Sequence, residues 1–317
     1  MERRRLHPSP TTPLPEPRAH RASTPPEPDA VRAYYRRKTA EILDKYGPGP
    51  RVHFRLGLVG DGPALSSTDP PATHRAALTA SQEAMLRHTA ELWGVRKSPP
   101  HHLLDAGCGL GGGALYWAAE LGSAVTALTP VPEHLPLVSG FARAAGVADR
   151  VTPLLGDVHD LAPDSPAVPA RGFDAVYASE SSGYFDRRRF FTTAARLVRP
   201  GGWVGVQEHF ILDPRWAGPL DRYYRTRLGT RREYLDAAAD AGLRLAVDED
   251  VTAGVAGFWR LSVGWNEAES ARLAAGGAPG GWSPERLAES SRLHRVFGDI
   301  WSEGGIETRL ILFRRPR

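Results

Sequence analysis

The stretch "LLDAGCGLGGG", residues 103–113, decides which fold we expect for this chain. Two leucines end a short apolar strand, and Asp105 follows them directly. Glycines then occupy every second position, at Gly107, Gly109 and Gly111. Glycine permits a tight turn and lets a ligand approach the backbone closely. The stretch therefore predicts a strand, a glycine-rich loop and a helix that together hold a small molecule.

The spacing of these glycines separates the chain from the dinucleotide-binding dehydrogenases. Their fingerprint is G-x-G-x-x-G, followed about 20 residues later by an acid for the ribose hydroxyls. Here the spacing is G-x-G-x-G, an acid precedes the first glycine by two residues, and the next strand ends at Thr129 instead of an acid. These three differences argue against a dehydrogenase.

From residue 101 onward, apolar strand patterns alternate with helical patterns of 10–15 residues, which favours parallel βαβ units in a doubly wound α/β sheet. The expected strands are 101–107, 124–129, 150–157, 173–179, 203–210, 243–251 and 307–315. The expected helices are 112–122, 132–146, 187–202, 231–242 and 284–298.

Three regions follow from these patterns. Residues 1–28 contain eight prolines and few large apolar side chains, so we expect a disordered Pro/Arg-rich tail. Residues 29–100 contain helical patterns from Asp29 and over 75–94, which predict a helical cap. Residues 101–317 form the ligand-binding core, with cap insertions near 211–230 and 252–283 that break the alternation.

Composition narrows the class of protein. Of 317 residues, 41% are hydrophobic and 24% charged, which is enough for a full core. The single Cys108 allows no disulfide within the chain, and no apolar run reaches the 18–20 residues or so that span a bilayer, so we expect a cytoplasmic protein. The net charge is +4, but no zinc-ligand spacing and no RNA-binding signature accompany it, so we expect neither a metal site nor a nucleic-acid partner.

Four motifs in order resemble the class I S-adenosylmethionine (SAM)-dependent methyltransferases. They are the glycine loop, the strand ending at Thr129, "LLGDVHDL" after the third strand, and "LVRPGGWVGVQE" at 197–208. The resemblance implies a Rossmann-like, mostly parallel seven-stranded sheet with helices on both faces and a helical cap. It implies that the loop glycines hold the methionine part of SAM, that Asp105 orients its amino group, and that Asp157 pairs with its adenine.

A threonine at position 129 resembles the branch that contains cyclopropane-fatty-acid synthases, tocopherol methyltransferases and terpenoid C-methyltransferases. Members of that branch usually have a glutamine on the ribose shortly afterwards, and this chain has His134 there, with Glu133 as an alternative contact.

The flanking sequences resemble the bacterial isoprenoid C-methyltransferases, which include geranyl diphosphate C-methyltransferases and the enzyme that methylates a prenylated indole in teleocidin biosynthesis. The segments are "ESSGY" at 180–184, "LDPRWAGP" at 212–219, "TRREYLDAAADAGL" at 230–243 and the N-terminal segment 34–58. The resemblance implies that Tyr34 and Tyr35 close over the cofactor, and that the chain forms homo-oligomers through its N-terminal segment.

In that group, the acid at the position of Glu180 is the proposed catalytic base. Methylation of an alkene leaves a carbocation, which needs a dry pocket, aromatic faces and one carboxylate to remove a proton. No basic residue stands within six positions of Glu180, and Tyr184 is expected to assist it. The candidate aromatic contacts are Phe185, Phe210, Trp216 and Trp259. A capping or anchoring role for Glu180 and core packing for the aromatics remain alternatives.

The resemblance implies an isoprenoid substrate, either a prenyl diphosphate or a finished prenylated metabolite. Abundant arginines, among them Arg55 and Arg231, favour a diphosphate, because arginine suits bidentate phosphate contacts. Diphosphate enzymes of the group have a "HHHYG"-like stretch, and here it is "HFRLG", which keeps His53 but has Arg55 in place of a histidine. Magnesium is expected only if the substrate carries a diphosphate.

Two other functions remain open from the sequence. One is an O- or N-methyltransferase of specialised metabolism, in which the acid only orients the nucleophile. The other is a SAM-binding protein without turnover. Identification of the methylated product separates them, since a new carbon–carbon bond is decisive.

Overall fold

The computed structural model describes residues 26–60, 65–66 and 68–317. The proline-rich segment expected to be disordered therefore lies outside the described residues except for its last three, and Pro28 already begins helix α1 (Pro28–Tyr46). Within the described ranges, no helix is both long and apolar enough to cross a bilayer.

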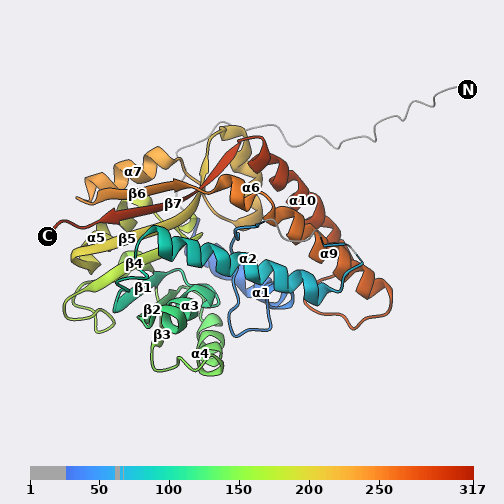
Figure 1. Cartoon of the computed structure of the whole chain (residues 1–317), viewed down its shortest axis with the longest axis horizontal. Coiled ribbons are helices and arrows are strands. Elements are labelled where there is room, and N and C mark those ends of the chain that lie inside the picture. Colours follow the sequence, from blue (N-terminus) through green and yellow to red (C-terminus); the bar gives the residue numbers. More distant parts are fainter. Residues whose placement is uncertain (1–25, 61–64, 67) are drawn as a thin grey trace, which may run out of the picture.

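A seven-stranded sheet with the order β3-β2-β1-β4-β5-β7-β6 forms the centre of the molecule (Figure 1). Neighbouring strands from β3 to β5 are parallel, and β7 is antiparallel to both β5 and β6. The mostly parallel seven-stranded sheet is thus confirmed. The strands are β1 (His102–Ala106), β2 (Ala124–Thr129), β3 (Val151–Leu155), β4 (Phe173–Ser179), β5 (Val198–Ile211), β6 (Arg244–Asp250) and β7 (Ile306–Arg314).

Helices cover both faces of the sheet because alternate side chains of its strands point to opposite sides. On one face, Leu104 of β1 packs into a cluster with α5 (Arg187–Leu197) and α7 (Arg231–Asp240). On the other, Leu103 packs with α3 (Gly112–Leu121), α4 (His134–Ala144) and α2 (Pro71–Leu92). The central strands β1, β4 and β5 are therefore mostly buried, whereas the edge strand β6 is largely exposed.

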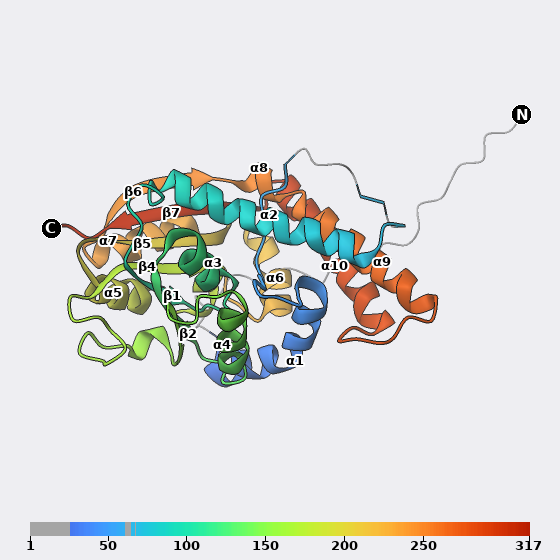
Figure 2. The same cartoon turned by 60° about the horizontal axis from the view of Figure 1, so that its bottom comes forward.

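A group of helices that we call the helical cap extends to one side of the sheet in both views (Figures 1 and 2). It comprises α1, α6 (Ala217–Tyr224), α8 (Thr252–Val255), α9 (Phe258–Ala274) and α10 (Pro284–Ser302). Helix α9 packs along both α2 and α10. The segments near 211–230 and 252–283 therefore supply helices outside the strand–helix alternation.

Several element boundaries differ from the sequence prediction, and two of them have a clear structural basis. Helix α2 begins at Pro71 instead of residue 75, because proline is favourable in the first turn of a helix. Helix α5 ends at Leu197, and the Pro-Gly-Gly segment expected at its end lies inside β5. A Cβ on Gly202 would lie 2.6 Å from the Asp174 carbonyl oxygen, so glycine lets β5 approach β4 closely there.

Candidate active site

The glycine loop lies between β1 and α3 and has the backbone that only glycine adopts readily. Gly107, Gly109 and Gly111 have φ angles of 82°, 55° and 83°. A Cβ on Gly107 would also lie 2.6 Å from the Cβ of Ser181. The loop is held close to the 3₁₀ turn η2 (Ser182–Tyr184) that follows β4, since Ser181 Oγ donates to the Ala106 carbonyl (2.6 Å).

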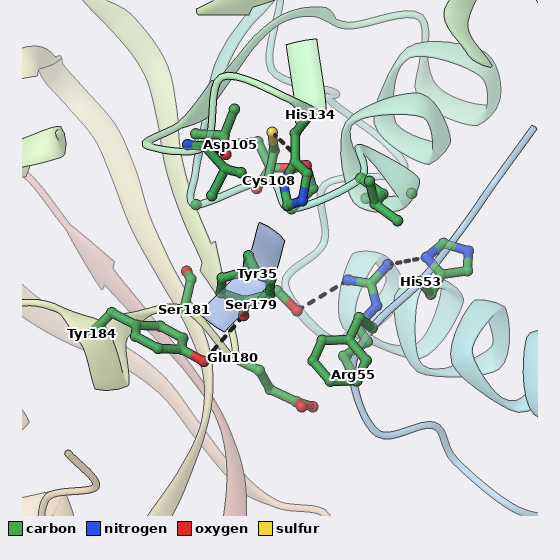
Figure 3. Close-up of a pocket in the computed structure, with 18 of the residues that line it drawn as sticks. Tyr35, His53, Arg55, Asp105, Cys108, His134, Ser179, Glu180, Ser181 and Tyr184 are labelled. Carbon is green, nitrogen blue, oxygen red and sulfur yellow. Dashed lines mark hydrogen bonds between the residues drawn. The ribbon is translucent and has the colours of Figure 1, made fainter. Parts of the chain in front are cut away.

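A cavity with about 830 Å³ of empty space opens above this loop, and we call it the cofactor cavity (Figure 3). Residues from four separate parts of the chain line it. They include Tyr35, His53, Arg55, Asp105, Gly107, Gly109, Thr129, His134, Glu180, Tyr184 and Phe185.

Asp105 supplies the cavity's buried acid at the end of β1. Its side chain is nearly inaccessible, and burial raises its pKa to about 7, with the Arg55 guanidinium acting in the opposite direction. A carboxylate in this position gains from any cationic ligand group, which would restore its ionised form. The site thus fits the amino group of an amino acid.

Thr129 and His134 also line the cofactor cavity. Thr129 Oγ1 accepts from the Val131 amide (3.3 Å). Burial lowers the pKa of His134 to about 4, so its ring is neutral, and its Nε2 lies 3.0 Å from Thr39 Oγ1. Glu133 is paired with Arg36 of α1 (2.8 Å).

Asp157 lies in an adjoining hollow with about 1,010 Å³ of empty space, which Phe185 and Gly107 also line. Its carboxylate is engaged by His159, whose backbone amide donates to it at 2.9 Å and whose Nδ1 lies 2.7 Å away. The position next to the cofactor cavity is compatible with an adenine contact from this acid.

Of the aromatic pair Tyr34–Tyr35, only Tyr35 lines the cofactor cavity. Tyr35 Oη donates to Tyr184 Oη (3.1 Å), which in turn donates to the Tyr224 carbonyl (2.8 Å), and this chain ties α1 to η2 and α6. Tyr34 does not line the cofactor cavity. It lines a basic groove between α1, α6 and α10.

Glu180 follows β4 directly and adopts a left-handed backbone, with φ of 49°. Its Oε1 accepts from the Leu56 amide (2.8 Å) and from Gln207 Nε2 (3.0 Å). Its Oε2 lies 3.2 Å from His209 Nε2. The carboxylate is therefore isolated from basic residues in the sequence but not in space, which corrects the expectation drawn from its neighbours in the chain.

Next to the cofactor cavity is a second cavity, the aromatic chamber, with about 630 Å³ of empty space. Tyr35, Phe54, Arg55, Glu180 and Tyr184 line both cavities, so the two adjoin at these residues. The remaining walls are largely aromatic and apolar. They include Tyr46, Leu56, Leu220, Tyr224, Leu228, Phe258, Trp259 and Trp301.

Two titratable residues of the chamber were missed from the sequence, Glu208 and His209 in "WVGVQEHF" of β5. Burial raises the pKa of Glu208, whose Oε2 accepts from Ser182 Oγ (2.7 Å) and the Gly183 amide (3.0 Å). Burial opposes the protonation of His209, but Glu180 and Glu208 outweigh it and raise its pKa. The sequence signal that could have identified Glu208 and His209 as site residues is the presence of two titratable side chains inside an otherwise apolar strand.

Three residues expected to contact the substrate lie elsewhere. Phe210 is fully buried on the other face of the sheet, with its ring centroid 4.9 Å from that of Tyr234. Arg231 pairs with Asp248 on the α7 side. Trp216 packs where a side chain on Gly305 would otherwise go. Strand alternation turns Phe210 away from its neighbour His209, which lines the aromatic chamber.

The comparisons with known proteins agree with this geometry. A family model described as "Methyltransferase domain" matches residues 104–206. A geranyl diphosphate 2-C-methyltransferase from Streptomyces lasalocidi is 28% identical over 68% of this chain and 70% of its own length. A probable chloroplastic tocopherol O-methyltransferase from Oryza sativa subsp. japonica is 27% identical over 65% of this chain, but the match spans only 58% of that relative.

The solved structure of a geranyl diphosphate methyltransferase in complex with GPP and sinefungin superposes with a TM-score of 0.70. The two chains are 22% identical, and the alignment covers 91% of this chain and 99% of the other. This likeness establishes the shared fold. The match to the family model shows that residues 104–206 form a methyltransferase domain, and the shared fold and the glycine-loop cavity agree with it.

Proposed function

We propose that this enzyme methylates a carbon–carbon double bond of an isoprenoid and that Glu180 is the base that completes the reaction. The observation that carries the proposal is the position of Glu180, which lines both the cofactor cavity and the aromatic chamber (Figure 3). The relatives named as geranyl diphosphate 2-C-methyltransferases support an isoprenoid substrate.

The residues of the cofactor cavity fit SAM. The loop glycines leave room beside the backbone, Asp105 suits an ammonium group, and Thr129 and His134 lie where a ribose contact is expected. Asp157 is assigned to the adenine, and Tyr35 to closure over the cofactor. When bound, the cofactor supplies an electrophilic methyl group.

The aromatic and apolar lining of the aromatic chamber suits a cation formed on the substrate. An alkene carbon that takes up a methyl group leaves positive charge on its neighbouring carbon. Tyr46, Phe54, Tyr224 and Trp259 line this space, and aromatic ring faces stabilise cations. The mostly apolar lining also excludes water, which would otherwise quench the cation.

Glu180 is placed to remove the proton that restores the double bond. Two donors, the Leu56 amide and Gln207, fix Oε1, so the carboxylate keeps one orientation. Tyr184 serves as a positioning residue. Its hydroxyl is committed to the Tyr224 carbonyl, and burial raises its pKa well above the usual value, so it stays neutral.

The charges of the chamber favour a prenylated metabolite over a prenyl diphosphate. Of the arginines named from the sequence, only Arg55 lines either cavity, and two carboxylates, Glu180 and Glu208, share the chamber with it. A diphosphate would face these acids. In the described part of the chain, no three His, Cys, Asp or Glu side chains cluster to hold a metal ion.

Incubation with methyl-labelled SAM and either geranyl diphosphate or a prenylated indole tests the proposal. A new carbon–carbon methyl bond in the prenyl group of the indole, identified by NMR, is the expected product. Labelling of oxygen or nitrogen instead would contradict C-methylation.

N-methylation is the second candidate, because two carboxylates among aromatic rings also suit a protonated amine.

Assembly into homo-oligomers through the N-terminal segment stays a prediction, which the molar mass in solution checks.

A further inference from the structure

The guanidinium of Arg55 is a buried cation with too few partners. Arg55 is only 7% exposed, and no described carboxylate lies within the 4.0 Å of an ion pair. Its Nη1 donates to Ser179 Oγ (3.0 Å) and more weakly to Tyr177 Oη (3.4 Å), and its Nη2 lies 2.8 Å from His53 Nδ1. A buried charge without a counter-charge is costly, so this arrangement is suited to an anionic ligand.

Two N–H donors of Arg55 remain without a partner. A guanidinium has five N–H donors. Three are accounted for by Ser179, Tyr177 and His53, which leaves the second hydrogen of Nη2 and the Nε–H. Nε is buried and has no hydrogen-bond partner among the described residues. A carboxylate is the group that such a fork recognises best.

The surrounding residues hold the guanidinium in place. Burial, and after it the charge of Arg55, lowers the pKa of His53 to about 4, so its neutral ring accepts the hydrogen bond from Nη2. Gln82 Nε2 donates to the carbonyl oxygens of Arg55 (2.8 Å) and His53 (3.3 Å). Arg55 is therefore pre-organised before any ligand binds.

Asp105 stands across Gly113 from Arg55. A Cβ built on Gly113 would lie 3.3 Å from Asp105 Oδ2 and 3.6 Å from Arg55 Nη1. The Asp105 carboxylate and the Arg55 guanidinium are thus separated by at most the sum of these two distances, yet they form no ion pair. A ligand group that carries both an ammonium and a carboxylate could contact both residues, which line the same cavity (Figure 3).

We propose that Arg55 binds the carboxylate of the cofactor's amino-acid end while Asp105 binds its ammonium group. This moves Arg55 from the expected substrate contacts to the cofactor contacts, and it rests on the assignment of SAM to this cavity. The first turn of α3 adds positive potential beside Gly113. A substrate anion in the chamber would instead meet Glu180 and Glu208.

Binding of two nucleosides by the full chain tests the assignment in isothermal titration calorimetry. S-adenosylhomocysteine carries the amino-acid end, and 5′-methylthioadenosine lacks it. We expect R55Q to weaken S-adenosylhomocysteine by about 10- to 100-fold, the cost of a lost charged hydrogen bond, and methylthioadenosine by less than about 3-fold. R51Q is the matched control, because Arg51 pairs with Glu83 and Glu120 outside the cavity wall, and it should change neither affinity.

G113A is a second variant that adds one methyl group between the two charges. Gly113 lies in α3, where alanine is the better helix former, so the fold should be at least as stable. We expect G113A to weaken S-adenosylhomocysteine and to spare methylthioadenosine.

Equal losses for both nucleosides in R55Q would overturn the assignment, since they would show a purely structural role. Unchanged binding of S-adenosylhomocysteine, with a raised KM for the isoprenoid that the enzyme methylates, would return Arg55 to the substrate contacts. Neither result touches the proposed C-methylation, which is decided by the product.

Discussion

The pair Glu180–His209 makes a quantitative prediction about stability and pH. Both side chains are about one-tenth exposed, at 12% and 11%, and their carboxylate and imidazole atoms lie 3.2 Å apart. Because Glu180 and Glu208 outweigh burial and raise the pKa of His209, the protonated imidazole stabilises the folded chain. This stabilisation is fully present below the unfolded value of about 6.5 and is lost as the pH rises through the raised folded pKa.

The substitution H209Q keeps a donor near Glu180 but removes the charge. We expect it to lower the free energy of unfolding by about 1.5–3 kcal/mol at pH 6, the value of a charged hydrogen bond. At pH 9, well above the ordinary imidazole pKa of about 6.5, the loss should shrink to about 1 kcal/mol or less as the charge is lost. Urea unfolding followed by tryptophan fluorescence measures both, and Trp301 lies against the His209 ring, with centroids 5.1 Å apart. Equal losses at both pH values would refute the ion pair.

Two further predictions concern the cofactor cavity. Since burial raises the pKa of Asp105 to about 7, the affinity for S-adenosylhomocysteine should rise as the pH increases through 7. Calorimetry of D105N should show weaker binding without this rise. A wild-type affinity that does not change with pH would contradict the prediction. G107A should destabilise the fold by about 1–3 kcal/mol more than G94A in urea unfolding. Both glycines have a positive φ, but only a Cβ at position 107 would clash with Ser181. Equal losses of stability would exclude the clash.

Much of the fold was predictable because strand and helix periodicities are local properties. Asp105 and the loop glycines were placed from sequence, and the structure brings them into one cavity with Glu180 and Tyr35. The facing of Phe210 and Trp216 was not predictable, because it depends on strand register and on where the cap helices dock. Likewise, no local pattern shows that His209 lies beside Glu180, since the two are brought together only by the pairing of β4 with β5.

The activity of E180Q tests the central claim most directly, because glutamine keeps the shape of Glu180 but cannot take a proton. We expect kcat to fall by about 10²- to 10⁴-fold, while the affinity for S-adenosylhomocysteine stays within about 2-fold. E249Q, which removes an exposed acid from β6, should retain the wild-type rate. If E180Q binds S-adenosylhomocysteine normally and still forms the C-methylated product at the wild-type rate, Glu180 is not the base.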